Sequence, residues 1–423
     1  MTFPRIDNIS WHDITPKLGA TYDLFGNGKT ALKATLNKYL LGYGTFAFGE
    51  NGLSSDPNPI FRLVNNATRT WVDADHDFVP DCSLLNFGEN GECGALDNPN
   101  FGSIVPGTSY DPDLLTGWGK RQFNWEFSAG VQHELMPRVS VDVFYFRRWY
   151  GNFQATDDRS VSPADYDRFT FPAPTDSRLP NGGGYTVTAV DLKFPQVFVP
   201  QDNFVTLANN YGKQTEHWNG VDFGANARLQ NGIILQGGVS TGRLVRDDCE
   251  ITEKLPETLH QFFGNTRLFF FPARPLSECH RNDGFLTQIK ALGSYVFPKI
   301  DVQLSATFQS YPGPVLDVNF NDFNTGTLGR PFGFGPFRSF EIVNQGDLVG
   351  DRLNQVDFRI AKIFRVGTTR TQVNFDLYNL FNSNAVLTEN AQYESWNPNQ
   401  NIGRTPTSIL QARFFKIGAQ FDF

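Results

Sequence analysis

Residues 123–146 read FNWEFSAGVQHELMPRVSVDVFYF, and their pattern decides the fold class. Every second residue from Phe123 to Val131 is apolar, and the residues between them are polar or glycine. After a Met-Pro pair the alternation resumes from Val139 to Tyr145. Because the side chains of a strand point alternately to its two faces, we predict two antiparallel strands joined by a tight turn, each with one apolar face.

The same alternation recurs along the chain. It is clear in VDFGANARL (221–229), DVQLSATFQS (301–310), NQVDFRIAKIF (354–364), QVNFDLYNLF (372–381) and FFKIGAQFDF (414–423). We predict about eleven strands, at residues 13–25, 29–44, 121–135, 138–150, 216–229, 232–245, 285–297, 300–311, 353–366, 370–383 and 409–423. The fold class is therefore all-β.

The connections between these strands alternate between short and long. Short turns fall near residues 26–29, 136–138, 230–232, 297–299 and 366–369, whereas polar, Pro- and Gly-rich connections span 45–120, 154–212, 249–284, 312–351 and 388–406. Loops of that length are uncommon inside a compact soluble domain. Short turns at one end and long loops at the other are typical of a transmembrane antiparallel β-barrel, with periplasmic turns and extracellular loops.

The alternative is a soluble sandwich or propeller, whose strands also alternate. Charged residues at the centres of the polar faces, such as Asp222, Arg359 and Asp376, suit a water-filled lumen better. Aromatic residues at strand ends, such as Trp125 and Trp149, suit membrane interfaces. We therefore expect the apolar faces to contact outer-membrane lipid, in the cell outer membrane of a Gram-negative bacterium.

Other function classes find little support in the sequence. There is no run of 18 apolar residues, and the net charge of -8 argues against binding to nucleic acid. The six histidines (His12, His76, His133, His217, His260 and His280) are scattered, and no known catalytic motif is present. We predict that the protein is not an enzyme; an enzyme reading would need catalytic groups in the lumen.

The four cysteines fall into two local groups. Cys82 and Cys93 enclose a short Gly-rich stretch, and Cys249 and Cys279 enclose a longer one. Four cysteines allow three connectivities, and spacing alone does not choose between them. Disulfides would indicate an oxidising compartment; the alternative is four free thiols.

The sequence DADHDFVPD offers Asp73, Asp75, Asp77 and Asp81 within the long connection at residues 45–120. Carboxylates at alternate positions of a tight turn converge, and such oxygen ligands suit Ca²⁺. The pattern lacks the glycine and glutamate of an EF-hand. We predict a structural calcium site at these four residues, with a solvated acidic loop as the alternative and His76 outside the ligand set.

The chain ends on an alternating strand whose last apolar residues are Phe421 and Phe423. A terminal phenylalanine on such a strand resembles the C-terminal signal by which outer-membrane proteins are recognised for assembly. We therefore expect these two residues to engage the barrel-assembly machinery.

Several segments resemble one known family. WHDITPKLGATYDLFGNGKTALKATLNKY (11–39), FDLYNLFNSNAV (375–386) and ILQARFFKIGAQFDF (409–423) are similar to barrel strands of TonB-dependent outer-membrane receptors. TWVDADHDFVPDCSLLNFGENGECG (70–94) further resembles the Oar-like group. The resemblance implies a barrel of about 22 strands closed around an N-terminal plug that contacts the TonB complex, and uptake of a large solute.

Eleven strands are half of such a barrel, so we expect residues 1–423 to form its C-terminal half. A signal peptide, a TonB box and a plug domain have no counterpart in the sequence, and an odd strand number also predicts a fragment. The alternative function is a passive porin-like or adhesive barrel built by self-association. No residue can be assigned to the solute, although aromatic runs at 268–275 and 319–337 lie in long connections, where we favour packing of loop on loop.

Overall fold

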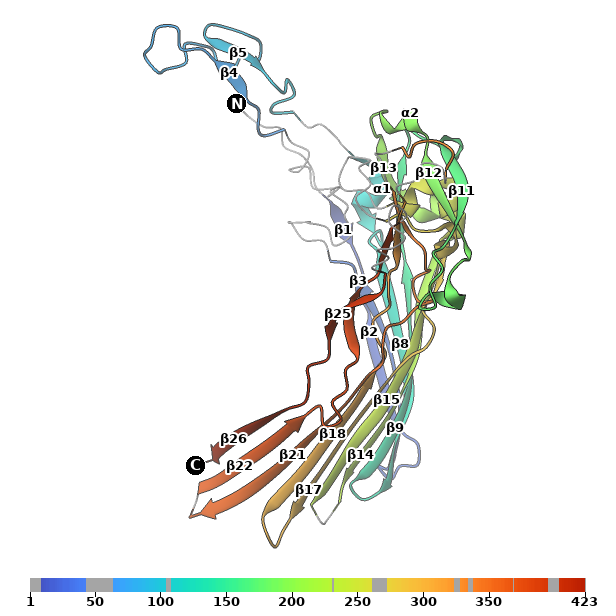
Figure 1. The fold of residues 1–423 in the computed structure, drawn as a ribbon, viewed down its shortest axis with the longest axis vertical. Coiled ribbons are helices and arrows are strands. Elements are labelled where there is room, and N and C mark those ends of the chain that lie inside the picture. The colour runs from blue at the N-terminus through green and yellow to red at the C-terminus, as the bar shows by residue number, and fades with distance from the viewer. Residues whose placement is uncertain are drawn as a thin grey trace.

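The computed structural model describes residues 9–42, 64–103, 108–229, 232–260, 272–322, 328–333, 338–367, 369–394 and 403–422. The chain is mostly β and is dominated by one large antiparallel sheet whose main strands follow chain order (Figure 1). They are β2 (Lys17–Asp23), β3 (Thr30–Leu40), β8 (Phe123–Met136), β9 (Val139–Gly151), β14 (Thr215–Arg228), β15 (Ile233–Asp247), β17 (Leu286–Phe297), β18 (Val302–Tyr311), β21 (Leu353–Val366), β22 (Thr369–Tyr378) and β26 (Phe414–Asp422). All eleven predicted strands are confirmed, and a short strand, β16 (His280–Asn282), adds to β15.

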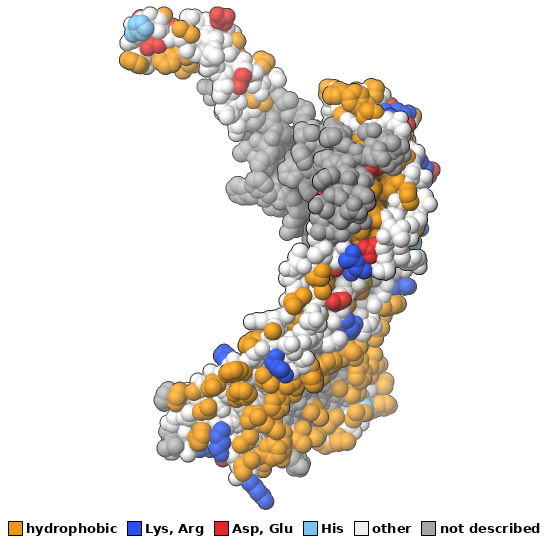
Figure 2. Space-filling model, in the orientation of Figure 1, with side chains coloured by type: hydrophobic (Ala, Val, Ile, Leu, Met, Phe, Trp, Pro, Cys, Tyr) orange, Lys and Arg blue, Asp and Glu red, His pale blue; other side chains and the backbone are white. Residues whose placement is uncertain are grey.

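The pairing register keeps the predicted apolar side chains on one face, which we call the apolar face. Val131 of β8 lies opposite Val143 of β9, which lies opposite Phe223 of β14. At the other side of the sheet, Phe375 of β22 lies opposite Ile417 of β26. These side chains are exposed, up to 69% for Ile417, so no described part of the chain covers them. In Figure 2 hydrophobic side chains gather over the lower part of the sheet.

The sheet is curved but not closed among the described residues. β2 pairs only with β3, and β26 pairs only with β22, so each presents one edge without a strand partner. The two ends of the sheet differ, as predicted. The short hairpin turns gather at the lower end in Figure 1, and the long connections gather at the upper end. Backbone of positive φ makes the short turns, as at Arg138 (φ 71°) and Gly232 (φ 79°).

The long connections carry secondary structure of their own, which the sequence analysis did not predict. Their strands are β4 (Arg69–Trp71), β5 (Cys93–Leu96), β6 (Thr108–Tyr110), β7 (Thr116–Trp118), β10 (Gln154–Asp158), β11 (Tyr166–Pro172), β12 (Thr186–Leu192), β13 (Asn203–Leu207), β19 (Asn319–Asp322), β20 (Arg338–Glu341), β23 (Val386–Asn390), β24 (Gln392–Glu394) and β25 (Thr405–Ile409). A further short strand, β1 (Ser10–His12), precedes β2 and pairs with β7. The helices are α1 (Pro112–Leu115), α2 (Phe194–Val197) and α3 (Cys249–Lys254), with 3-10 turns at Pro163–Asp165, Pro180–Gly182, Ala208–Asn210, Pro256–Leu259 and Leu276–Cys279. No helix in the described part of the chain has the length and apolarity needed to cross a membrane.

The largest hydrophobic core lies among these connections and not in the large sheet. We call the unit that surrounds it the loop assembly. Its core side chains come from four different connections: Phe171, Ala173, Leu179, Val187, Ala189, Ala273, Leu316, Val318, Phe332, Phe340, Ile342, Val343 and Tyr393. The described ends of both aromatic runs, Ala273 and Phe332 among them, are buried here. Residues 268–271, 323–327 and 334–337 of those runs lie outside the described residues.

Candidate functional site

The second face of the large sheet, which we call the polar face, carries hydrogen-bonded charges between adjacent strands. Glu126 of β8 lies opposite Arg148 of β9 and pairs with it, and Arg359 of β21 pairs with Asp376 of β22. Cross-strand pairs of opposite charge stabilise a sheet and hold each other's side chains in place. The polar face is therefore a fixed, charged wall.

Hydroxyl and amide groups fill the spaces between these pairs. The Thr35 and Ser128 hydroxyls lie 2.7 Å apart, and the Gln303 amide donates to the Ser294 hydroxyl at 2.8 Å. Such groups bind water or the polar groups of a solute equally well. The wall can thus line a hydrated passage.

One aromatic side chain lies flat on the polar face. A Cβ at Gly220 would fall 2.1 Å from Cη2 of Trp218, and one at Gly242 would fall 2.2 Å from its Cζ2, so only glycine leaves room for the ring. Trp218 is half-buried and sits near the loop end of β14. Trp218 was not among the predicted site residues, because most aromatic residues of the alternating strands were expected on the apolar face. The signal was available: Trp218 and Phe144 occupy polar positions of the alternation.

The loop assembly is fastened by a buried charge cluster around Asp191, whose side chain is fully buried. Its carboxylate accepts hydrogen bonds from Nη1 of Arg330 at 2.9 Å and from the backbone N–H of Gly333 at 3.0 Å. Nε of Arg338 lies 3.6 Å from the same carboxylate. Burial raises the pKa of Asp191, and the two guanidiniums oppose that rise. The cluster ties β12 to the connection that contains Arg330 and Arg338.

Buried carboxyls also occur in the loop assembly. Burial raises the pKa of Glu257 to about 7. Burial and the neighbouring Glu278 together raise the pKa of Glu341 to about 9. These groups lie inside packed structure, where protonation affects stability more directly than it affects a bound solute.

The carboxylates that lie together in the acidic connection are not the four that were predicted to bind calcium. Carboxylate oxygens of Asp73, Asp75 and Glu92 lie within 4.8 Å of one another, and that group does not include Asp77 or Asp81. Glu92 accepts hydrogen bonds from the backbone N–H groups of Ala74 and Asp81. Glu92 was not among the predicted ligands because it is distant in sequence from Asp73 and Asp75, although the adjacent Cys93 was a signal that this segment returns to the acidic turn. The calcium site stays a prediction.

Both cysteine groups are bonded locally. Cys82 is bonded to Cys93 with 5.8 Å between Cα atoms, and Cys249 is bonded to Cys279 with 4.7 Å between them. The first bond closes the acidic connection, and the second joins α3 to the 3-10 turn before β16. Of the two residues assigned to the assembly signal, Phe421 lies on the apolar face, and Phe423 lies outside the described residues.

The six histidines lie apart from one another. Nδ1 of His133 is 2.8 Å from the Thr30 hydroxyl at the short-turn end of the apolar face, and Nδ1 of His280 is 3.0 Å from Asp247. His260 is buried against Arg338 in the loop assembly. The Thr30–His133 contact joins a hydroxyl to an imidazole on the apolar face, away from the charged polar face.

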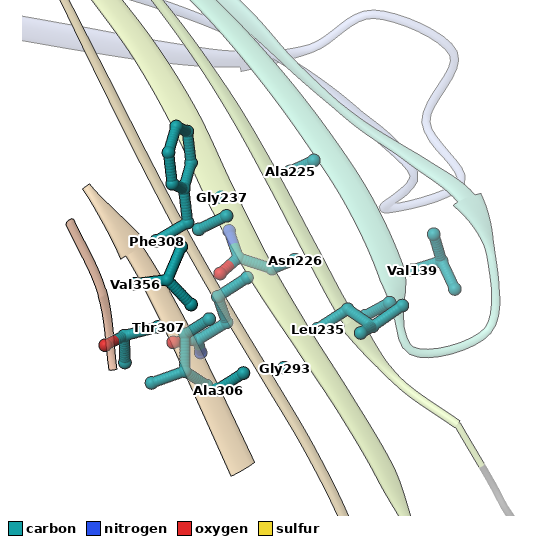
Figure 3. Close-up of a pocket in the computed structure, with 14 residues that line it drawn as sticks. Val139, Ala225, Asn226, Leu235, Gly237, Gly293, Ala306, Thr307, Phe308 and Val356 are labelled. Atoms are coloured by element: carbon teal, nitrogen blue, oxygen red, sulfur yellow. The ribbon is translucent and has the colours of Figure 1, made fainter. Parts of the chain in front are cut away.

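A shallow depression of about 520 Å³ interrupts the apolar face (Figure 3). Small side chains such as Ala225, Gly237 and Ala306 make its floor, and Leu235 and Phe308 border it. A second depression, of about 450 Å³, lies at the loop end of the same face. Its lining includes Arg147, Trp149 and His217, together with Phe127.

The chain is similar to solved structures of outer-membrane proteins. The outer membrane transporter YddB from Escherichia coli is 11% identical with a TM-score of 0.41, and the match covers 95% of this chain and 39% of YddB. FpvA of P. aeruginosa, bound to heterologous pyoverdines, is 10% identical with a TM-score of 0.41, covering 96% of this chain and 32% of FpvA. The siderophore receptor PirA from Acinetobacter baumannii is 11% identical with a TM-score of 0.36, covering 96% of this chain and 40% of PirA.

The chain therefore spans two-fifths or less of the length of these three proteins. No protein-family model and no curated protein matches the sequence.

Proposed function

We propose that this chain forms part of the wall of an outer-membrane β-barrel that takes up a large solute with energy relayed through TonB, as in the Oar-like receptors that the sequence resembles. The observation that carries the proposal is the constant register of eleven strands, which gives one exposed apolar face and one charged polar face. An apolar face without a protein layer suits lipid, and a wall of hydrogen-bonded charges suits a hydrated lumen.

The two edge strands of the sheet would need partners if the sheet lies in a membrane. Unpaired backbone groups at β2 and β26 would be costly in hydrocarbon, because nothing there can satisfy them. We propose that further strands complete the barrel, and that a plug domain fills it. The loop assembly would then stand outside the cell, above the lumen, and would contact the solute first.

The first test is topology. An antibody against residues 70–94 should bind intact cells, whereas a tag placed in the turn between β17 and β18 should become accessible only after permeabilisation. On an immunoblot of outer membranes, a band well above 47.5 kDa supports a plug and further strands in one polypeptide. Recovery in the soluble fraction, or reversed accessibility, would refute the membrane barrel.

The second test separates energy-coupled uptake from the passive alternative. Deleting this gene and deleting tonB should impair growth on the same nutrient when a broad panel of iron and carbon sources is screened. A growth defect of the gene deletion that is absent from the tonB deletion would favour a passive porin-like or adhesive barrel.

A further inference from the structure

The depression at the loop end of the apolar face differs from the rest of that face in its charge. By register, Lys38 of β3, Trp125 of β8, Trp149 of β9 and His217 of β14 form one cross-strand row. The next row toward the sheet centre contains Phe127, Arg147, Asn219 and Arg243. Of these residues, Phe127, Arg147, Trp149 and His217 line the depression, and Lys38, Trp125 and Arg243 extend the two rows on the neighbouring strands.

These cations have no acidic partner that the structure describes. None of the ion pairs among the described residues includes Lys38, Arg147 or Arg243, although the protein carries a net charge of -8. By register, Glu216, which also borders the depression, belongs to the polar face, because it lies opposite Arg246. On the apolar face of the eleven strands the register places one carboxylate, Asp247, at the very end of β15 and beside His280.

Aromatic and amide side chains hold the residues of the two rows in place. Trp125 and Trp149 stack with 6.3 Å between ring centroids, and Asn219 accepts a hydrogen bond from the Tyr145 hydroxyl at 2.8 Å. Nη1 of Arg147 reaches the same Asn219 oxygen at 3.5 Å, and the guanidinium of Arg243 lies 5.1 Å from the Phe285 ring. Both arginines are thus held on the face by neighbours that leave their positive charge uncompensated.

We propose that this depression, together with Arg243 in the adjoining row, binds the headgroup of a phosphate-bearing membrane lipid, with its acyl chains along the apolar band below. Arginine donates two parallel N–H groups to phosphate oxygens, and tryptophan belongs at the boundary between headgroups and acyl chains. Continuity with the apolar band favours a lipid over a free anion. The inference rests on the proposed function, because a lipid reaches this face only if the sheet spans a membrane.

The test is native mass spectrometry of the full chain in detergent, titrated with phosphatidic acid, with diacylglycerol of the same chains and with inorganic phosphate. We expect phosphatidic acid to be retained in preference to diacylglycerol. Each arginine removed, as Arg147→Gln or Arg243→Gln, should weaken retention about fivefold, and the double variant about 25-fold. The matched control is Lys362→Gln, which removes a cation from the same face at its short-turn end and should leave retention unchanged.

Three outcomes would overturn the proposal: equal retention of both lipids, an equal loss with Lys362→Gln, or displacement of phosphatidic acid by inorganic phosphate, which would indicate a site for free anions. The amount of each variant in outer-membrane fractions is also measured as a control for folding and insertion. Loss of lipid with normal recovery supports the headgroup site, whereas absence of the unsubstituted chain from the outer membrane counts against the barrel itself.

Discussion

Asp191 is a fully buried carboxylate of the loop assembly that lies beside two arginines. We predict that Asp191→Asn destabilises the loop assembly by about 3–5 kcal/mol, because it removes a carboxylate from two arginines in a buried site. Hydrogen–deuterium exchange of β11 and β12 measures the loss. The control is Asp202→Asn, which breaks an ion pair to Arg159 that is about half exposed and should cost about 1 kcal/mol or less. Equal effects of the two changes would contradict this account.

Glu257 should make the stability of the loop assembly depend on pH. Its pKa is raised from 4.5 to about 7 by burial, so the folded protein binds this proton more tightly than the unfolded chain. The contribution of Glu257 to stability is then greatest below pH 4.5 and falls as pH rises toward 7, by about 3 kcal/mol at most. Glu257→Gln should make the total fall smaller by that amount and leave the part due to Glu341, whereas Glu253→Gln, at an exposed position of α3, should leave the whole fall unchanged. Hydrogen–deuterium exchange rates of the loop assembly, measured between pH 4 and 8, test this prediction. A fall in stability of equal size in both variants would contradict it.

At the scale of single elements, the calcium prediction for the acidic connection can be tested by comparing the predicted carboxylates with those that the structure brings together. Asp75 belongs to both the predicted and the observed carboxylate groups, whereas Asp77 belongs to the predicted group alone. If calcium binds the observed group, Asp75→Asn should weaken binding about tenfold or more and Asp77→Asn should change it little. Calorimetric titration of the full chain measures both. No heat from the unsubstituted chain would leave the solvated acidic loop as the correct reading.

The strands of the large sheet were predictable because alternation is a local signal. Each of the eleven appears where residues such as Val221 and Phe223 alternate with Asp222 and Gly224. The elements of the loop assembly were not predictable in the same way. β19 pairs with β24, some 70 residues away, and β13 pairs with β6. Such short strands depend on distant partners, so their sequence carries little signal of its own.

The candidate sites differ in the same way: some are formed by residues close in sequence, and others by residues far apart. The acidic residues and the cysteines stand out in the sequence because they cluster within a few positions. Arg147 and Arg243 are almost a hundred residues apart, and only the register of β9, β14 and β15 brings them to one row. The position of Trp218 could be seen only in the structure for another reason. Its ring lies over Gly220 and Gly242, where any larger residue would clash with it.

For the molecule as a whole, the two faces of the sheet should tolerate charge very differently. We predict that Phe375→Arg costs about 2–4 kcal/mol of stability in the membrane, because Phe375 lies mid-strand on the apolar face, opposite Ile360 and Ile417. Asn374→Arg, one residue earlier on the polar face, should be tolerated. Denaturant midpoints of both variants in lipid vesicles provide the measurement. Equal tolerance of both changes would mean that the apolar face does not meet lipid.

The hydroxyl of Tyr393 donates a hydrogen bond to Asp176, 217 residues earlier, at 2.9 Å. Contacts of such long sequence separation carry a large loop-closure entropy and form slowly, whereas hairpins such as β8–β9 close across two residues. The loop assembly should consequently be the last part of the protein to mature. In a pulse-chase experiment its connections should stay sensitive to added protease after the hairpins have become resistant. Newly made molecules would then pass through an interval in which the large sheet is built and the loop assembly is not yet packed.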